Sequence, residues 1–163
     1  MCGIVGFINL QNNYSFDPSL LIKNMINEVK SRGPDFQNYW IDKENQVYLG
    51  HARLAIIDLN QRSNQPIQTQ DGNWTIIFNG EIYNYEELKK SIENNNNLTG
   101  DTSVLVALIA KYGFENAIKK IEGMFAIAAW DRNSGKLFLS RDRMGEKPLY
   151  YSIDNDLISF GSN

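Results

Sequence analysis

The sequence predicts an α+β fold built from antiparallel sheets. Segments with strand character come in runs separated by hairpin-like turns, and segments with helical character lie singly or grouped between those runs. A parallel βαβ fold would instead alternate strands with helices. No P-loop and no GxGxxG motif occurs in the chain, so a nucleotide-binding sheet has no local support.

The first third of the chain predicts several strands and one helix. Asp17 and Pro18 open this helix as N-cap and first-turn proline, and Gly33 lies past its end. The apolar face of the helix carries Leu21, Met25, Ile26 and Val29. Apolar and β-branched residues predict a buried strand at 3–8, and polar turns separate further strands expected at 37–41, 46–49 and 53–58.

A further strand and its turns are predicted in the middle of the chain. The strand at 74–78 follows a turn at Asp71-Gly72. It is expected to stop at Asn79-Gly80, because these residues tolerate the positive φ of a sharp turn.

Helices and a last run of strands complete the pattern. Asn84 and Glu87 resemble a capping box that opens a helix through Lys90. The asparagine run at 94–97 predicts a frayed helix end or a loop. A helix at 103–112 and a short helical piece through Lys120 come next. The expected final strands are 124–130, 137–140, 149–153 and 157–160, with a turn at 133–136.

Length and composition limit the class of protein. A chain of 163 residues suits one sizeable core and hence one domain. Its formal charge of −3 gives no reason to expect a nucleic acid or an acidic membrane as partner. No segment approaches the roughly 18 apolar residues of a membrane helix, and no secretory signal opens the chain. The single cysteine excludes an internal disulfide and favours the cytoplasm.

That cysteine, Cys2, directly follows Met1. Removal of Met1 would give one residue both a thiol nucleophile and a free α-amine. A thiol with a pKa of about 8.5 needs a base at neutral pH, and an amine with a pKa of about 7.7–8.0 can take its proton directly or through one water. By itself, a cysteine at this position is more often a small buried hydrophobe. The other motifs of the chain are needed to distinguish this explanation from a catalytic role.

Six segments occur in order along the chain: MCGIVGF at 1–7, SRGPD at 31–35, GHARLAIID at 50–58, FNGEIYNY at 78–85, EGMFAIAAWD at 122–131 and RDRMGEKPLYY at 141–151. Together they resemble the class II glutamine amidotransferase domain, and most nearly the N-terminal glutaminase domain of glutamine-dependent asparagine synthetases. The resemblance covers nearly the whole chain. It implies the N-terminal nucleophile hydrolase fold, a four-layer αββα sandwich of two antiparallel sheets.

The resemblance also implies roles for individual residues. Cys2 would attack the side-chain amide of glutamine, form a glutamyl thioester and release ammonia. Asn79 and the backbone N–H of Gly80 would form the oxyanion hole. Arg53 would hold the α-carboxylate of glutamine, and Asp101 would receive its α-ammonium. The pocket would be completed by Glu81 and the backbone of Leu54, Ala55, Ile56 and Ile57.

Several of these residues also have an ordinary structural explanation. Asn79-Gly80 could be a plain hairpin turn, and Arg53 a surface residue at a strand edge. Asp101 could be the N-cap of the helix near Ser103, and the chain reads GDTS there instead of the family's frequent SDTE. Glu81 could be a solvated turn residue.

Two further residues bear on the site. Met144 stands where an aromatic residue is common in the last motif. That motif is expected to have a structural or partner-facing role and no catalytic one. His51, the only histidine, ranks below the terminal amine as the base, because a lone histidine beside a strand usually packs or forms a hydrogen bond.

In the complete family enzymes, ammonia passes to a C-terminal synthetase domain that activates a carboxylate with ATP. We therefore expect L-glutamine as substrate, no cofactor or metal in this domain, and ATP and Mg²⁺ only in a synthetase domain absent from this chain. Residues 1–163 would then be an N-terminal fragment. The acceptor could be aspartate or another carboxylate such as a sugar acid, and a homodimer is left open.

Two other functions remain open at this point. The first is an inactive glutaminase-like packing or regulatory module, which retention of Met1 would favour. The second is an N-terminal nucleophile hydrolase that acts on another amide, against which Arg53 and Asp101 argue.

Overall fold

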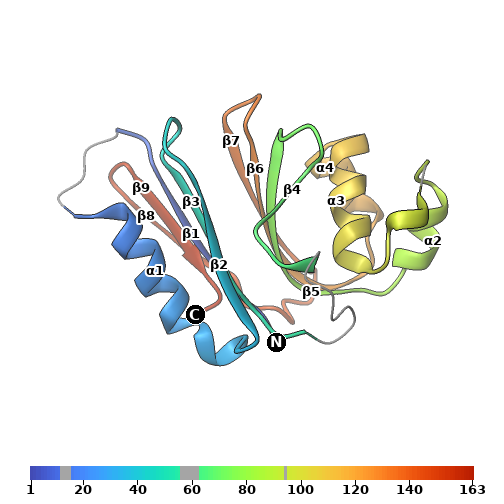
Figure 1. The fold of residues 1–163 in the computed structure, drawn as a ribbon, viewed down its shortest axis with the longest axis horizontal. Helices are drawn as coiled ribbons and strands as arrows, with labels where there is room; N and C mark the ends of the chain where they lie inside the picture. The colour runs from blue at the N-terminus through green and yellow to red at the C-terminus, as the bar shows by residue number, and fades with distance from the viewer. Residues whose placement is uncertain (12–15, 56–62, 94) are drawn as a thin grey trace.

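Two antiparallel sheets lie face to face in the computed structural model, and helices cover the outer face of each (Figure 1). The structure describes residues 1–11, 16–55, 63–93 and 95–163. The first sheet has the order β2-β3-β1-β9-β8 and the second the order β4-β5-β6-β7. This arrangement confirms the predicted α+β class and the four-layer αββα sandwich.

The strands of the first sheet are β1 (Gly3–Asn9), β2 (Phe36–Asp42), β3 (Val47–Arg53), β8 (Tyr150–Asp154) and β9 (Leu157–Gly161). The strands of the second sheet are β4 (Ile67–Gln68), β5 (Trp74–Ile82), β6 (Gly123–Asp131) and β7 (Lys136–Arg141). β1 pairs with β3 on one side and with β9 on the other, so the start of the chain lies in the middle of its sheet.

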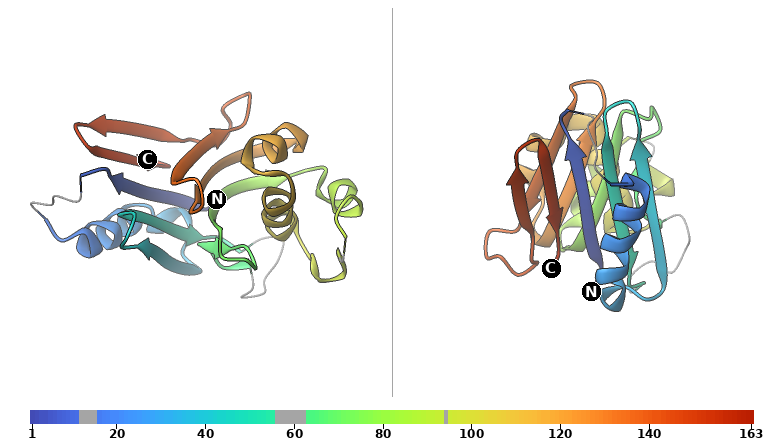
Figure 2. Two further views of the ribbon diagram at one scale, coloured as in Figure 1. Left: turned by 90° about the horizontal axis from the view of Figure 1, so that it is seen from above. Right: turned by 90° about the vertical axis from the view of Figure 1, so that its left-hand side faces the viewer.

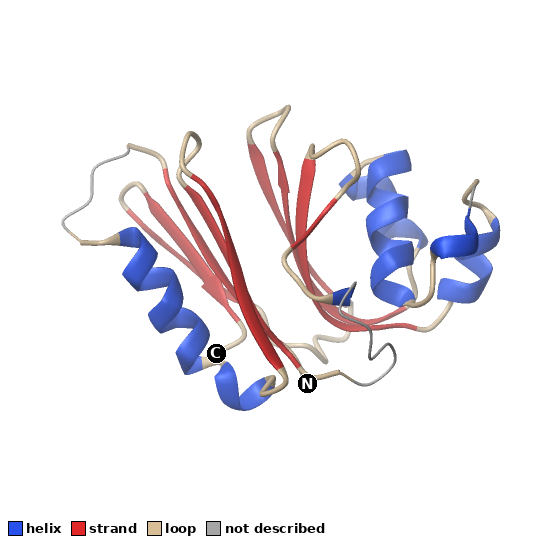
Figure 3. Ribbon diagram, in the orientation of Figure 1, coloured by secondary structure: helices blue, strands red, loops and turns tan. Residues whose placement is uncertain are grey.

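The helices are α1 (Pro18–Glu28), α2 (Tyr85–Lys90), α3 (Asp101–Tyr112) and α4 (Phe114–Lys120), with short 3₁₀ turns η1 (Lys30–Arg32) and η3 (Asn95–Asn97). α1 lies across the outer face of the first sheet, and the remaining α-helices lie beyond the second sheet (Figures 2 and 3). None of the helices in the described part of the chain is long and apolar enough to cross a membrane.

The alternation of side chains along the strands fills both faces of each sheet. In β1, Ile4 and Ile8 enter the layer between the sheets, whereas Val5 and Phe7 pack under α1. In β5, Ile77 enters the inter-sheet layer and its neighbours face the helices. Because both faces are buried, these strands read as continuous apolar runs.

Helix α1 begins with the N-cap residue and first-turn proline that the sequence predicts. Asp17 accepts hydrogen bonds from the backbone N–H groups of Ser19 at 2.8 Å and Leu20 at 3.3 Å, and Pro18 occupies the first helical position. The turn at Asp71-Gly72 is also confirmed, since Gly72 has a φ of 70°.

The predicted turn at Asn79-Gly80 is wrong. β5 runs unbroken from Trp74 to Ile82, and Gly80 does not have a positive φ. The glycine serves a close approach instead, because a Cβ added to Gly80 would lie 2.1 Å from the carbonyl oxygen of Met124 on β6. Glycine is therefore required at position 80 because β5 and β6 approach each other closely, and not because the chain turns there.

Other local predictions also need correction. The strand expected at 53–58 does not begin at Arg53, which is the last residue of β3; Leu54 and Ala55 lie outside any strand, and 56–58 fall outside the described residues. The capping box at Asn84 does not form. The Asn84 side chain instead donates to the Lys120 carbonyl at 3.0 Å and accepts from the Glu122 N–H at 3.0 Å.

Two helical boundaries differ from expectation as well. α3 begins at Asp101, two residues before the predicted start, and Gly100 is its N-cap. Ser103 closes this end, because its hydroxyl donates to the Gly100 carbonyl at 2.7 Å and accepts from the Gly100 N–H at 3.3 Å. In the asparagine run, Asn95–Asn97 forms the 3₁₀ turn η3 rather than a frayed end or loop.

Candidate active site

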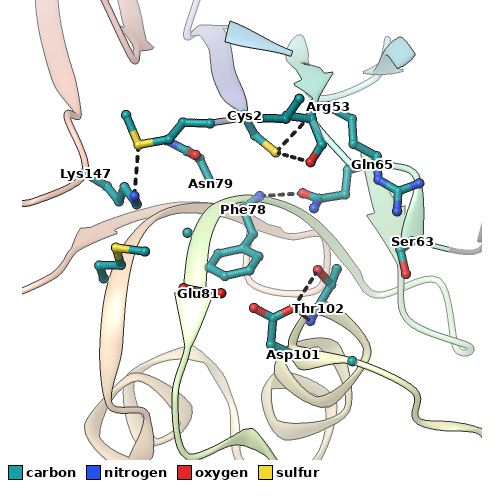
Figure 4. A pocket seen from close by; sticks show the side chains of 15 residues that line it. Cys2, Arg53, Ser63, Gln65, Phe78, Asn79, Glu81, Asp101, Thr102 and Lys147 are labelled. Carbon is teal, nitrogen blue, oxygen red and sulfur yellow. Dashed lines mark hydrogen bonds between the residues drawn. The ribbon is translucent and has the colours of Figure 1, made fainter. Parts of the chain in front are cut away.

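A cavity of about 140 Å³ lies where the start of the chain meets the second sheet (Figure 4). It is lined by the N-terminus, the end of β3, the segment before β4, the middle of β5, the start of α3, the start of β6 and the loop that follows β7. Of the residues predicted from the sequence, those at the cavity are Cys2, Arg53, Leu54, Asn79, Gly80, Glu81 and Asp101. Residues far apart in the chain therefore meet at one site.

Strand pairing fixes the position of Cys2. Gly3 pairs with Ala52, so Cys2 lies beside the end of β3. The Leu54 N–H donates to the Cys2 Sγ at 3.4 Å, and the Sγ lies 3.7 Å from the Leu54 carbonyl oxygen. The alternation that sends Ile4 between the sheets directs Cys2 toward the same layer.

Burial raises the pKa of the Cys2 thiol. The Leu54 backbone, the positive N-terminus and Arg53 oppose this shift, and Asp101 adds to it. Since only the thiolate is strongly nucleophilic, a thiol at this position needs a base next to it at neutral pH.

Arg32 also holds this residue in place. Its Nε donates to the Cys2 carbonyl oxygen at 3.2 Å, and its Nη1 donates to the Asn163 side chain at 3.3 Å. Arg32 lies in the SRGPD segment, but its contact with Cys2 was not predicted, because nothing in the local sequence indicates which backbone group an arginine will reach.

Asn79 supplies a buried donor that faces the cavity. The residue is 1% exposed, and its Nδ2 has no hydrogen-bond partner among the described residues. An unpaired buried amide is costly, by about 1–3 kcal/mol, and such groups often occur where a ligand completes the bonding. Figure 4 shows Asn79 close to Cys2, on the side of the cavity where Lys147 lies.

The N–H of Gly80 points to the same edge of β5 as those of its alternate neighbours. The Phe78 N–H donates to the Gln65 side chain at 2.6 Å, and the Ile82 N–H donates to Asp101 at 3.2 Å. Because N–H directions alternate along an antiparallel strand, the Gly80 N–H points between these two toward the cavity edge. Two donors from adjacent residues, Asn79 and Gly80, thus border one space.

Asp101 is the first residue of α3 and is 6% exposed. Besides the Ile82 N–H, its carboxylate accepts the Thr102 N–H at 2.7 Å. Burial raises the pKa of Asp101, and these backbone bonds oppose the shift. The alternative explanation, that Asp101 is the N-cap of α3, is excluded by the position of Gly100.

Arg53 is 7% exposed, so it is not the exposed strand-edge arginine of the alternative explanation. Its Nη1 donates to the Asn64 side chain at 2.5 Å. Ala55 was predicted at the pocket but does not line the cavity, and its N–H donates to Asp35 at 2.8 Å. Ile56 and Ile57 lie outside the described residues.

Glu81 lines the cavity from β5, where it pairs with Met124. The alternative, a solvated turn residue, is wrong because β5 continues through this position. His51 is fully buried and does not line the cavity; its Nε2 lies 3.1 Å from the Phe78 carbonyl oxygen. The described geometry therefore offers no pairing of His51 with Cys2.

Sequence reasoning missed several residues of the cavity wall. Gln65 is 4% exposed and fixes β5 through Phe78. Lys147 is 5% exposed, and its Nζ donates to the Met1 Sδ at 2.9 Å. The other missed residues are Met1, Ser63, Phe78, Gly100, Thr102 and Met124. Lys147 was within reach of prediction, because it belongs to the last of the six segments.

That segment, 141–151, also has a clear structural role. Asp142 is buried and accepts N–H groups of Glu146 at 2.8 Å, Lys147 at 3.0 Å and Phe125 at 3.2 Å. Burial alone would raise the pKa of Asp142, but these bonds outweigh it and hold the pKa below its ordinary value. The loop after β7 is thereby tied to β6.

The fold and the cavity define a glutamine amidotransferase domain. The family model described as "Glutamine amidotransferase domain" matches residues 1–163. The chain belongs to this family.

Among curated relatives, asparagine synthetase [glutamine-hydrolyzing] 2 of Bacillus subtilis is 42% identical over 161 residues, which cover 97% of this chain and 21% of that protein. Asparagine synthetase [glutamine-hydrolyzing] 1 of the same organism is 42% identical and is covered over 26% of its length, against 99% of this chain. An amidase of Gibberella zeae is 36% identical, with 94% of this chain and 24% of that protein covered. The chain thus spans about a quarter of the length of these relatives.

Proposed function

We propose that this domain hydrolyses the side-chain amide of L-glutamine through a thioester on Cys2. The observation that carries the proposal is the pair of donors beside the thiol: the buried Nδ2 of Asn79, which has no partner among the described residues, and the N–H of Gly80. Donors held ready in a partly dehydrated site stabilise negative charge that develops only during the reaction. The carbonyl oxygen of the glutamine side chain would accept a hydrogen bond from each of these two donors.

The charged groups of the cavity fit the other end of the substrate. Arg53 is a planar donor suited to the α-carboxylate of glutamine, and Asp101 is an acceptor suited to its α-ammonium. Both are buried at the cavity wall. Glu81 and the Leu54 backbone would complete the pocket, together with Ile56 and Ile57.

The reaction begins after removal of Met1. The neutral α-amine of Cys2 takes the proton from Sγ as the sulfur attacks the amide carbon. When the tetrahedral intermediate collapses, the carbon–nitrogen bond breaks, and the leaving nitrogen takes this proton and departs as ammonia. Water then attacks the thioester and gives a proton to the amine, which returns it to sulfur as glutamate leaves.

The ammonia would serve a synthetase domain of a longer parent protein. The relatives that carry the name asparagine synthetase are three to five times as long as the matched segment. We therefore propose that residues 1–163 form one domain of such a protein, and that ATP and Mg²⁺ act in the other domain to make asparagine. A reducing cytoplasm would keep Cys2 as a free thiol.

A second candidate is supply of ammonia to a different acceptor, or hydrolysis of another amide. Relatives named as amidases, from Gibberella zeae and Penicillium rubens, match this chain at 36% and 34% identity, so the family is not confined to proteins named as synthetases. Comparing hydrolysis of glutamine with that of asparagine and of simple amides would distinguish these cases. A preference for glutamine that disappears in Arg53→Ala would support the first proposal.

The decisive experiment compares three purified proteins: wild type, Cys2→Ala, and a control with one glutamate inserted between Met1 and Cys2. The insertion keeps the thiol but leaves its nitrogen in a peptide bond. Intact mass establishes whether Met1 is absent, and glutamate release measures activity. We expect activity in the wild type alone. Wild type that lacks Met1 and releases no glutamate would support the inactive module instead.

A further inference from the structure

Lys147 is a buried cation at the wall of the cavity. It is 5% exposed, and no ion pair joins it to a carboxylate within the described part of the chain. Its ammonium donates instead to the thioether sulfur of Met1, at 2.9 Å. Lysine is rarely buried unless it is paired, and a thioether is only a weak acceptor. The position of this charge therefore calls for a functional explanation.

The backbone at Lys147 is held firmly. The Asp142 carboxylate accepts the N–H of Lys147 at 3.0 Å and, through the same oxygen, the N–H of Phe125 at 3.2 Å. Phe125 pairs with Gly80 across β5 and β6. The loop that carries Lys147 is thus fixed to the strand pair that presents the donors of the site.

The direction of the side chain is also defined. Lys147 points into the cavity from the side opposite Arg53, Gln65 and Ser63 (Figure 4). Its contact with Met1 shows that the ammonium reaches the residue bonded to the nitrogen of Cys2. When Met1 is removed, the ammonium and the new α-amine border the same cavity, across the space that Met1 occupied.

We propose that Lys147 is a positioning residue whose ammonium stands beside the Cys2 α-amine and keeps that amine in the neutral, proton-accepting form. This inference rests on the proposed function, in which the amine is the base. A nearby positive charge disfavours protonation of an amine, most strongly where water is partly excluded. Lys147 would therefore help the amine to accept the thiol proton at neutral pH.

Charged groups from four other elements line the cavity or bond to Cys2, and the Asp142 carboxylate accepts the backbone N–H of Lys147. Arg32 from η1 and Arg53 from β3 act in the same direction as Lys147, whereas Glu81 from β5 and Asp101 from α3 act against it. Under the proposed function, bound glutamine pairs its own charges with Arg53 and Asp101. Lys147 and Arg32 then remain as the cations that act on the amine, and Arg32 is already bonded to the Cys2 carbonyl and to Asn163.

The test is the pH profile of glutamine hydrolysis by the Met1-free full chain, for wild type, Lys147→Met and Lys147→Arg. We expect the acidic limb of the Lys147→Met profile to move up by about one pH unit, with turnover largely retained on the alkaline side. Lys147→Arg keeps the charge and should restore the wild-type profile. A Lys147→Met profile reduced by one factor at all pH values would overturn the proposal, because it would show a structural role alone.

A second measurement separates this inference from the glutaminase proposal. An aldehyde such as glyoxylate condenses with the neutral amine and the thiol of an N-terminal cysteine to give a thiazolidine and water, with no need for glutamine. The pH midpoint of this condensation, followed by intact mass, should be higher in Lys147→Met than in wild type. Lys147→Gln provides a second neutral variant if Lys147→Met does not fold.

Equal midpoints in folded wild type and neutral variant would overturn the role of Lys147. Failure of the wild type to hydrolyse glutamine would contradict the proposed function, and a shifted thiazolidine midpoint would still support the effect of Lys147 on the amine.

Discussion

His51 allows a quantitative prediction about the dependence of stability on pH. Burial is the main cause that lowers the pKa of His51 from 6.5 to about 4; the bond to the Phe78 carbonyl opposes this, and Arg53 adds to it. Because a carbonyl only accepts, the Nε2 carries the hydrogen in this bond. Nδ1 is buried without a partner in the described structure, so a proton added there would have no acceptor.

The sign follows from proton binding in the two states. The folded protein holds His51 neutral, whereas the unfolded chain binds a proton below pH 6.5. The contribution of His51 to stability is therefore complete above pH 6.5 and is lost as the pH falls toward 4. One pKa unit corresponds to about 1.4 kcal/mol, so the loss amounts to about 2 kcal/mol at pH 5 and about 3 kcal/mol at pH 4.

The assay is urea denaturation of wild type and His51→Gln at pH 7 and pH 5. Glutamine can still donate to the Phe78 carbonyl but does not titrate. We expect the free energy of unfolding to fall between these pH values by about 2 kcal/mol more in wild type than in His51→Gln. The raised pKa of Asp101 acts in the opposite direction, but it is present in both proteins and cancels in the comparison. An identical pH dependence in the two proteins would refute the reasoning.

Three further variants test the site and its support. Asn79→Ala should reduce glutamate release by about 10²–10³-fold while changing the free energy of unfolding little, because the lost donor has no partner among the residues that the structure describes; parallel losses of activity and stability would count against this. Gly80→Ala should destabilise the domain by about 1–3 kcal/mol in thermal or urea unfolding, since its Cβ would lie 2.1 Å from a backbone carbonyl oxygen; an unchanged midpoint would disagree with that packing. Asp142→Asn should lower stability by about 1–3 kcal/mol, because the buried carboxylate that accepts several N–H groups loses its charge; wild-type stability in urea would show that this cluster is not needed.

The sequence is informative where local pattern and tertiary structure agree. The apolar segment at the start of the chain predicts a strand, and pairing on both sides makes it β1. The N-cap at Asp17 predicts the start of α1 within a residue. No local pattern predicts that residues far apart in the chain will meet. The resemblance of the ordered motifs to a known family is what predicted one site for Cys2, Arg53, Asn79 and Asp101.

Prediction failed where a distant contact overrides a local preference. Asn79-Gly80 has the composition of a turn, but the close approach of β6 keeps it in a strand. Asn84 has the composition of a cap, but its side chain bonds to Lys120 and Glu122. Gln65 carries no local signal of its place, because it reaches the cavity only through tertiary packing. Lys147 belongs to a matched motif, but only the packing of the loop after β7 shows that it lines the cavity.

The most direct test of the thioester is a rapid acid quench of the Met1-free protein during turnover of glutamine, followed by intact-mass and peptide analysis. The chemistry described here predicts a covalently bound glutamyl group on Cys2 that is absent from Cys2→Ala and disappears with hydroxylamine. Steady release of glutamate by the wild type, with no acyl group trapped at any quench time and undiminished release by Cys2→Ala, would contradict it.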